Sequence, residues 1–134
     1  MTTLSAASLS AALDRLRADA STFDRALAPA GEATALRPAL QALLAARLAA
    51  LQADDEVGQV ADVLRRDQKY APTGRPSIHL VQLRKQQAGA KQAALVARQA
   101  HARAAQDFVR ALALKITPRL TPVAVTDRWL QQAI

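Results

Sequence analysis

Basic side chains recur at regular spacing in the second half of this chain, and they are the residues best suited to bind a ligand. Arg84, Lys91 and Arg98 lie seven residues apart, and Arg103 and Arg110 repeat that interval. Seven residues make almost two turns of an α-helix, so each row follows one side of the helix. Guanidinium and ammonium groups bind phosphate and carboxylate oxygens. We therefore predict that these five residues contact an anionic partner.

A second row of side chains lies beside the first. Lys85, Gln92, Gln99 and Gln106 also fall seven apart, and together the rows predict one long stripe of positive charge and amide groups on a rigid helix. The alternative is an exposed helix face with no partner, because Lys, Arg and Gln are good helix formers. Against it, residues 65–119 hold twelve basic and only two acidic residues, whereas exposed helices usually carry acids that pair at i, i+4.

Charge is distributed unevenly over the whole chain. Residues 1–64 hold five basic and eight acidic side chains, residues 65–134 hold thirteen and three, and the net charge is +7. Such asymmetry indicates an anionic partner, either nucleic acid, an acidic protein surface or the acidic half of a neighbouring copy. The basic rows contain no aromatic residue that could stack on bases. Binding to nucleic acid would therefore follow the phosphate backbone without base specificity.

Residues that could support catalysis or metal binding are poorly placed for it. His79 and His101 are 22 residues apart in sequence, roughly 33 Å along one helix, so they cannot share a metal or relay a proton. The acidic cluster around Asp54 lacks the glycine and the spacing of a calcium loop, and the chain has no cysteine. We expect no enzyme, no cofactor and no metal, and we interpret His101 as a packed or interface residue.

The segment after Tyr70 is the clearest break in the helical pattern. Its Gly74-Arg75-Pro76 run resembles the core of an AT-hook, which inserts an arginine into a narrow minor groove. The arginine that precedes this core in an AT-hook is replaced here by Thr73. Glycine and proline also suit an inter-helix turn without any further function, and we favour that interpretation, with Ser77 capping the helix that follows.

Apolar residues recur at helical spacing on both sides of this break. A first helix, about residues 5–28, has a seam of Leu9, Leu13, Leu16, Ala20, Phe23 and Leu27. A second, about 34–69, presents Leu36, Leu40, Leu44, Leu48 and Leu51 and then, in a shifted register, Val57, Val60 and Leu64. We favour one continuous or slightly kinked second helix over a separate helix capped by Asp54.

A third helix, about residues 77–116, would be a rod of ~60 Å. Read as heptads, its a positions are Leu80, Gln87, Ala94, His101 and Phe108, and its d positions are Leu83, Ala90, Ala97, Ala104 and Ala111. A seam made largely of alanine permits close helix approach but excludes little water. The leucine-rich seams of the first two helices are expected to supply the larger side chains.

The last 18 residues break the helical pattern with two Thr-Pro pairs, which predict an extended C-terminal arm. Residues 123–125 would form a short strand, and Thr126 and Asp127 would cap a short terminal helix. That helix displays Trp129, Leu130 and Ile134, which we predict to be docking residues. Two interpretations remain open: the arm anchors in a groove on a partner or a neighbouring copy, or it folds back onto its own bundle.

The composition points to an all-α fold. Apolar residues make up 51% of the 134 residues, aromatic residues only 3%, and 33 are alanine, which favours helix but buries little area. We predict an Ala-rich helical bundle or coiled-coil-like assembly of about three main helices (residues 1–116) plus the arm (residues 117–134). A thin core favours packing against other copies or another protein.

From these features we expect a non-catalytic structural or assembly subunit of a larger bacterial or phage complex. It would be a homo-oligomer or bind other proteins, with its basic helix face toward an anionic partner. A nucleic-acid-binding accessory subunit is the alternative. We expect no membrane partner, because the most apolar window, residues 36–51, is interrupted by Arg37, Pro38 and Arg47. The N-terminus does not resemble a classical signal peptide, so a cytoplasmic or virion-associated location is expected.

Overall fold

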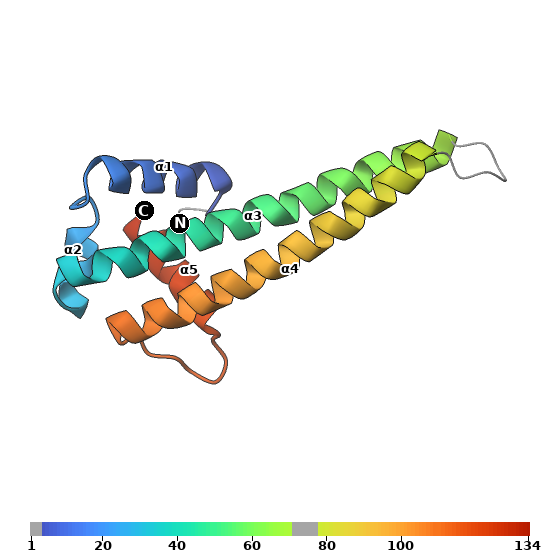
Figure 1. Ribbon diagram of the computed structural model, residues 1–134. Helices are drawn as coiled ribbons and strands as arrows, with labels where there is room; N and C mark the ends of the chain where they lie inside the picture. The colour runs from blue at the N-terminus through green and yellow to red at the C-terminus, as the bar shows by residue number, and fades with distance from the viewer. Residues whose placement is uncertain (1–3, 71–77) are drawn as a thin grey trace.

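Two long antiparallel helices form the body of the protein (Figure 1). The computed structural model describes residues 4–70 and 78–134. Helix α3 (Ala33–Tyr70) and helix α4 (Ile78–Leu112) pair along their length, and α1 (Ala6–Ala18), α2 (Asp24–Leu27), the 3-10 helix η1 (Ala28–Ala30) and α5 (Pro122–Ala133) gather near one end. No strand occurs in the described parts of the chain. The predicted all-α bundle with a short C-terminal helix is confirmed.

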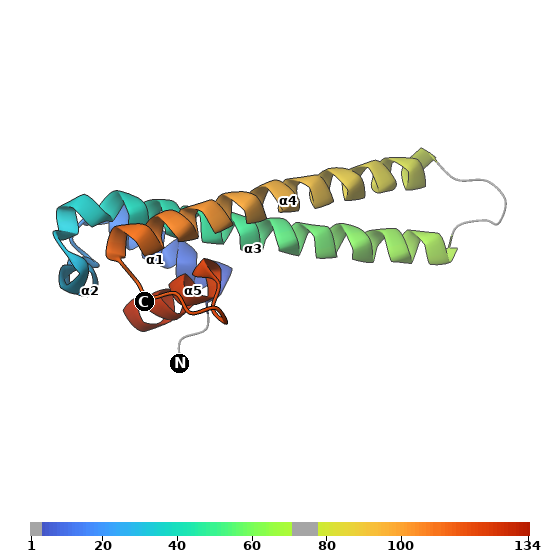
Figure 2. The same ribbon diagram turned by 90° about the horizontal axis from the view of Figure 1, so that it is seen from below.

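Helices α1, α2 and α5 all lie on one side of the α3–α4 hairpin (Figure 2). We call this end, with residues 33–51 of α3 and 98–112 of α4, the head. The remaining parts of the two long helices, residues 52–70 and 78–97, form a two-helix arm. The head core is built from the following buried residues: Leu9, Ala12, Leu13, Leu16, Phe23, Leu27, Leu36, Leu40, Leu43, Leu44, Ala105, Phe108, Leu112 and Leu130. A separate small cluster of Leu64, Leu80 and Leu83 lies near the far end of the arm.

The first predicted helix is wrong in its extent, because α1 ends at Ala18 instead of Ala28. Ser5 caps its start, where the Ser5 and Ser8 side chains each accept a hydrogen bond from the other's backbone N–H. At its end the Asp19 carboxylate accepts bonds from the Ser21 N–H (3.0 Å) and hydroxyl (2.6 Å). Short polar side chains that bond the nearby backbone favour a turn over a helix. The chain therefore turns before α2, and Phe23 still reaches the core.

Helix α3 is continuous through Asp54, as the sequence predicted, and its 38 residues span about 57 Å. Helix α4 begins within one residue of its predicted start but ends at Leu112, four residues early. There Ala113 adopts a positive φ of 51°, and the Leu114 N–H donates to the Val109 carbonyl at 3.0 Å. This is a Schellman motif, in which glycine usually occupies the left-handed position. The sequence did not predict this helix end, because the left-handed position holds alanine instead of glycine.

The predicted strand at residues 123–125 is wrong, since these residues belong to α5. The Thr121 hydroxyl accepts a hydrogen bond from the Ala124 N–H at 3.2 Å, and Pro122 occupies the first helical position, where its missing N–H costs nothing. Thr126, predicted to cap the helix, is instead buried inside it, and its hydroxyl donates to the Val123 carbonyl at 3.0 Å. The predicted turn at Thr73–Pro76 and the cap at Ser77 lie outside the described residues.

Leu40 tests the importance of the head core. Its side chain is 1% exposed, so Leu40→Ala should lower the free energy of unfolding by about 2–5 kcal/mol through lost burial and a residual cavity. The matched control is Leu95→Ala on α4, where the side chain is 48% exposed and a change within about 0.5 kcal/mol is expected. Urea unfolding followed by circular dichroism measures both. Equal losses would contradict the assignment of the core.

Candidate functional site

Packing of α3 against α4 brings basic residues from both helices to the same end of the arm. Leu64 packs with Leu80 and Leu83, and the Asp67 carboxylate lies 2.6 Å from the His79 imidazole. In this register the neighbouring cations of both helices lie within roughly 12 Å along the arm. We call this group, Arg65, Arg66, Lys69, Arg84 and Lys85, the distal basic collar. All five side chains are exposed.

Acidic side chains neutralise little of the collar. Asp62 pairs with Arg65 within α3, and Asp67 is engaged by His79. The other four collar residues make no ion pair within residues 4–70 and 78–134. The ammonium of Lys69 lies 5.8 Å from the ring centroid of Tyr70, a cation–π contact that leaves its charge in place. The end of the arm therefore presents a net positive surface.

The five residues predicted to contact an anionic partner do not form one group in the structure. Arg84 belongs to the collar, and Lys91 lies about 10 Å further along α4. Arg98 binds Asp54 of α3 at 2.7 Å, so its charge is compensated within the chain. Arg103 and Arg110 are exposed on the head, and the helical repeat turns Arg103 by about 140° from Arg98. The predicted rows therefore do not share one side of the helix.

The predicted docking residues of the C-terminal arm pack within their own chain. Leu130 is 1% exposed, and the Trp129 ring makes an edge contact with Phe108 of α4 at a centroid distance of 4.9 Å. Ile134 is partly buried against the head core. Of the two interpretations left open by the sequence, the structure shows the arm folded back, and these side chains complete the core.

A partly buried polar cluster joins α3, α4 and α5 in the head. His101 is 5% exposed, as its heptad position predicted. Beside it Arg47 of α3 and Asp127 of α5 form an ion pair with a shortest contact of 3.1 Å. Burial lowers the pKa of His101, the Arg47 cation lowers it further, and Asp127 opposes the shift. The Arg47–Asp127 pair could not be predicted from the sequence, because 80 residues separate its partners.

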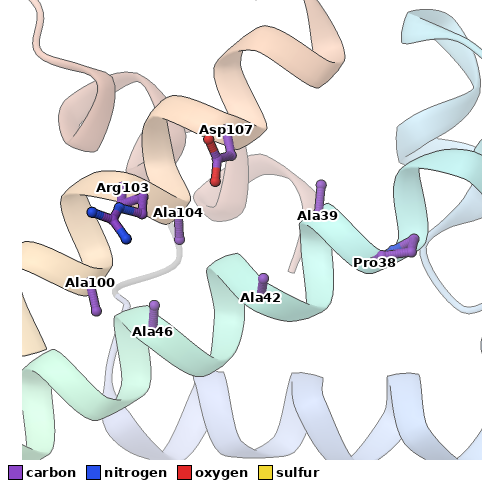
Figure 3. Close-up of a pocket in the computed structure, with 8 residues that line it drawn as sticks. All are labelled: Pro38, Ala39, Ala42, Ala46, Ala100, Arg103, Ala104 and Asp107. Atoms are coloured by element: carbon purple, nitrogen blue, oxygen red, sulfur yellow. The ribbon is translucent and has the colours of Figure 1, made fainter.

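An alanine-lined groove lies between α3 and α4 on the face of the head opposite α1 and α5 (Figure 3). Its volume is about 510 Å³. The lining residues are Pro38, Ala39, Ala42 and Ala46 of α3 and Ala100, Arg103, Ala104 and Asp107 of α4. The alanines present backbone and methyl groups to the groove, and Arg103 and Asp107 lie along its α4 side.

Within residues 4–70 and 78–134, no three His, Asp or Glu side chains are grouped closely enough to hold a metal ion. None of the helices in these ranges is both long and apolar enough to cross a membrane. Neither a protein-family model, a curated protein nor a solved structure matches this chain. Within the described residues, the basic collar and the alanine-lined groove are the surfaces best suited to bind a partner.

The buried histidine predicts a pH dependence of stability. Because the pKa of His101 is lowered in the folded protein from an ordinary value of 6.5, the unfolded chain binds a proton that the folded chain resists. Stability should therefore fall as the pH drops through about 6.5. Urea unfolding between pH 8 and about pH 5 measures this loss, which His101→Gln should reduce. The control variant His79→Gln should retain it, and equal pH dependence in all three proteins would contradict this role of His101.

Proposed function

We propose that this protein is a non-catalytic assembly subunit that uses its two-helix arm to present the distal basic collar to an anionic partner. Its main support is that Arg66, Lys69, Arg84 and Lys85 gather at the same end of the arm and make no ion pair within the described residues. These cations come from two sequence segments, and only the antiparallel pairing of α3 with α4 unites them. Clustered charge of one sign attracts and orients a partner of opposite sign.

The position of the collar supports a role in reaching a partner. Residues 52–70 of α3 extend roughly 28 Å at the helical rise, and this part of the hairpin projects away from α1, α2 and α5 (Figure 1). Only two helices pack there, so each has a broad exposed side. A partner can therefore approach the end of the arm without meeting the head.

An acidic protein surface is the partner that the arm fits best. Exposed apolar side chains accompany the collar: Tyr70 and Ile78 are each 80% exposed, and Val63 and Val81 are about 40% exposed. Protein interfaces combine apolar contact with a charged rim, whereas a phosphate backbone offers mainly charge. The apolar groups would then bury against the partner while the collar contacts its acidic residues.

Nucleic acid remains the second candidate, because the collar cations alone would bind a phosphate backbone. No base-reading arrangement supports it, and the exposed aromatic side chain near the collar is limited to Tyr70 in the described chain. Such binding would be insensitive to sequence and strongly weakened by salt.

The collar can be tested with two anionic probes, a fluorescent acidic amphipathic peptide and a fluorescent sequence-neutral DNA duplex. The triple variant Arg66→Glu, Arg84→Glu, Lys85→Glu should weaken binding by about tenfold or more, because each substitution replaces attraction by repulsion. The matched control is Arg17→Glu, Arg25→Glu, Arg119→Glu, which makes the same charge change at exposed positions elsewhere. Fluorescence anisotropy over a salt series measures both, and equal weakening by the two variants would contradict a localised site.

Substitution of the exposed apolar side chains distinguishes an acidic protein partner from nucleic acid. Replacing Tyr70 and Ile78 by serine should weaken binding of the peptide and leave duplex binding nearly unchanged. Tighter binding of the duplex, unaffected by these serines, would favour nucleic acid instead. No binding of either probe even at low salt, where charge attraction is strongest, would overturn the proposal.

A further inference from the structure

We propose that the alanine-lined groove of the head binds the same groove of a second copy of this chain, in an antiparallel two-fold arrangement. The groove is separate from the basic collar. Three of its features support the dimer: the face on which it lies, the size of its side chains and the pattern of its charges.

The groove lies on the side of the hairpin that no other helix within residues 4–70 and 78–134 covers. Helices α1 and α5 bury the opposite side of the head (Figure 2), and the groove lining contains only residues of α3 and α4. This side of the head is therefore the side on which another layer of helices can be added.

The lining residues permit close approach by a helical surface. Ala42 and Ala46 of α3 and Ala100 and Ala104 of α4 are each one helical turn apart and project only methyl groups (Figure 3). Small side chains at an interface allow helix backbones to come close and gain many van der Waals contacts. Two such grooves placed face to face would form a four-helix layer from two hairpins.

The two charged residues of the groove are complementary to the same two residues of a second copy. Arg103 and Asp107 are four residues apart on α4, and neither makes an ion pair within the described parts of the chain. In a two-fold interface, if residue i meets residue j, then j meets i. When two α4 helices run antiparallel, Arg103 of each copy can face Asp107 of the other, forming two intermolecular pairs.

The same charges argue against other occupants and other orientations. One cation and one anion give the groove no net charge, so it does not favour a strongly acidic or basic partner as the collar does. A parallel pair of α4 helices would place Arg103 opposite Arg103 and Asp107 opposite Asp107, which is repulsive. The antiparallel dimer has a further consequence: its two arms point in opposite directions and place a basic collar at each end.

Sedimentation velocity of the full chain over a wide concentration range tests the dimer. The wild-type protein should show concentration-dependent dimerisation. Arg103→Glu and Asp107→Lys should each raise the dimer dissociation constant by about tenfold, because each places like charges across the two-fold axis. The double variant should restore dimerisation, since it re-creates both pairs with their signs exchanged. Arg119→Glu, at an exposed position outside the groove, is the matched control and should leave the dissociation constant unchanged.

Steric and orientation tests complete the experiment. Ala104→Trp fills the groove and should give a monomer with wild-type helicity by circular dichroism, which separates loss of the interface from loss of the fold. Spin labels on a cysteine replacing Gln41 of the head should lie close together in the dimer, whereas labels replacing Gln82 of the arm should lie far apart. A protein that remains monomeric at all concentrations, a dimer insensitive to both the charge and the Trp variants, or short distances at both label sites would overturn the proposal.

Discussion

Antiparallel packing of α3 against α4 is the interaction on which the rest of this structure depends. The two helices contribute different side chains to their common seam. In the head, Leu36, Leu40, Leu43 and Leu44 of α3 pack in one cluster with Ala105, Phe108 and Leu112 of α4. In the arm, the buried residues of α4 include the small side chains of Ala90 and Ala94, which permit close approach of the two helices. Helices α1 and α5 then bury the remaining apolar surface of one side of the head.

The same pairing of α3 with α4 determines which charged side chains form ion pairs within the chain. Near the middle of the hairpin, Asp54 and Arg98 neutralise each other across the two helices, and in the head Arg47 engages Asp127 beside His101. At the end of the arm, cations from both helices meet with few acids among them. The acidic and basic halves of the sequence therefore compensate each other in part within one chain. Four collar cations without an ion pair lie at the end of the arm, and Lys91, Arg103 and Arg110 also remain unpaired along α4 within the described residues.

Sequence periodicity predicted the helices and the core positions that arise from repeated spacing. It did not predict helix ends set by single local hydrogen bonds, or contacts between residues far apart in the sequence. The burial of His101 followed from the heptad pattern of the third helix, and the continuity of α3 was the favoured prediction although its apolar register shifts after Asp54. The early ends of α1 and α4 did not, because Asp19 and Ala113 set them through a side-chain turn and a left-handed backbone. The basic collar and the Arg47–Asp127 pair require the register of the hairpin, which a single sequence does not specify.

Hydrogen exchange measured peptide by peptide tests most directly whether one continuous α3–α4 pair supports both the head and the arm. Amides of residues 33–51 and 98–112 should be the most protected, because other helices pack on them. Amides of the arm should exchange faster yet remain protected well above an unfolded chain, since two paired helices hold them. Unprotected amides throughout residues 52–69 and 79–97 would contradict the account, because the arm would then not exist as a paired unit in solution.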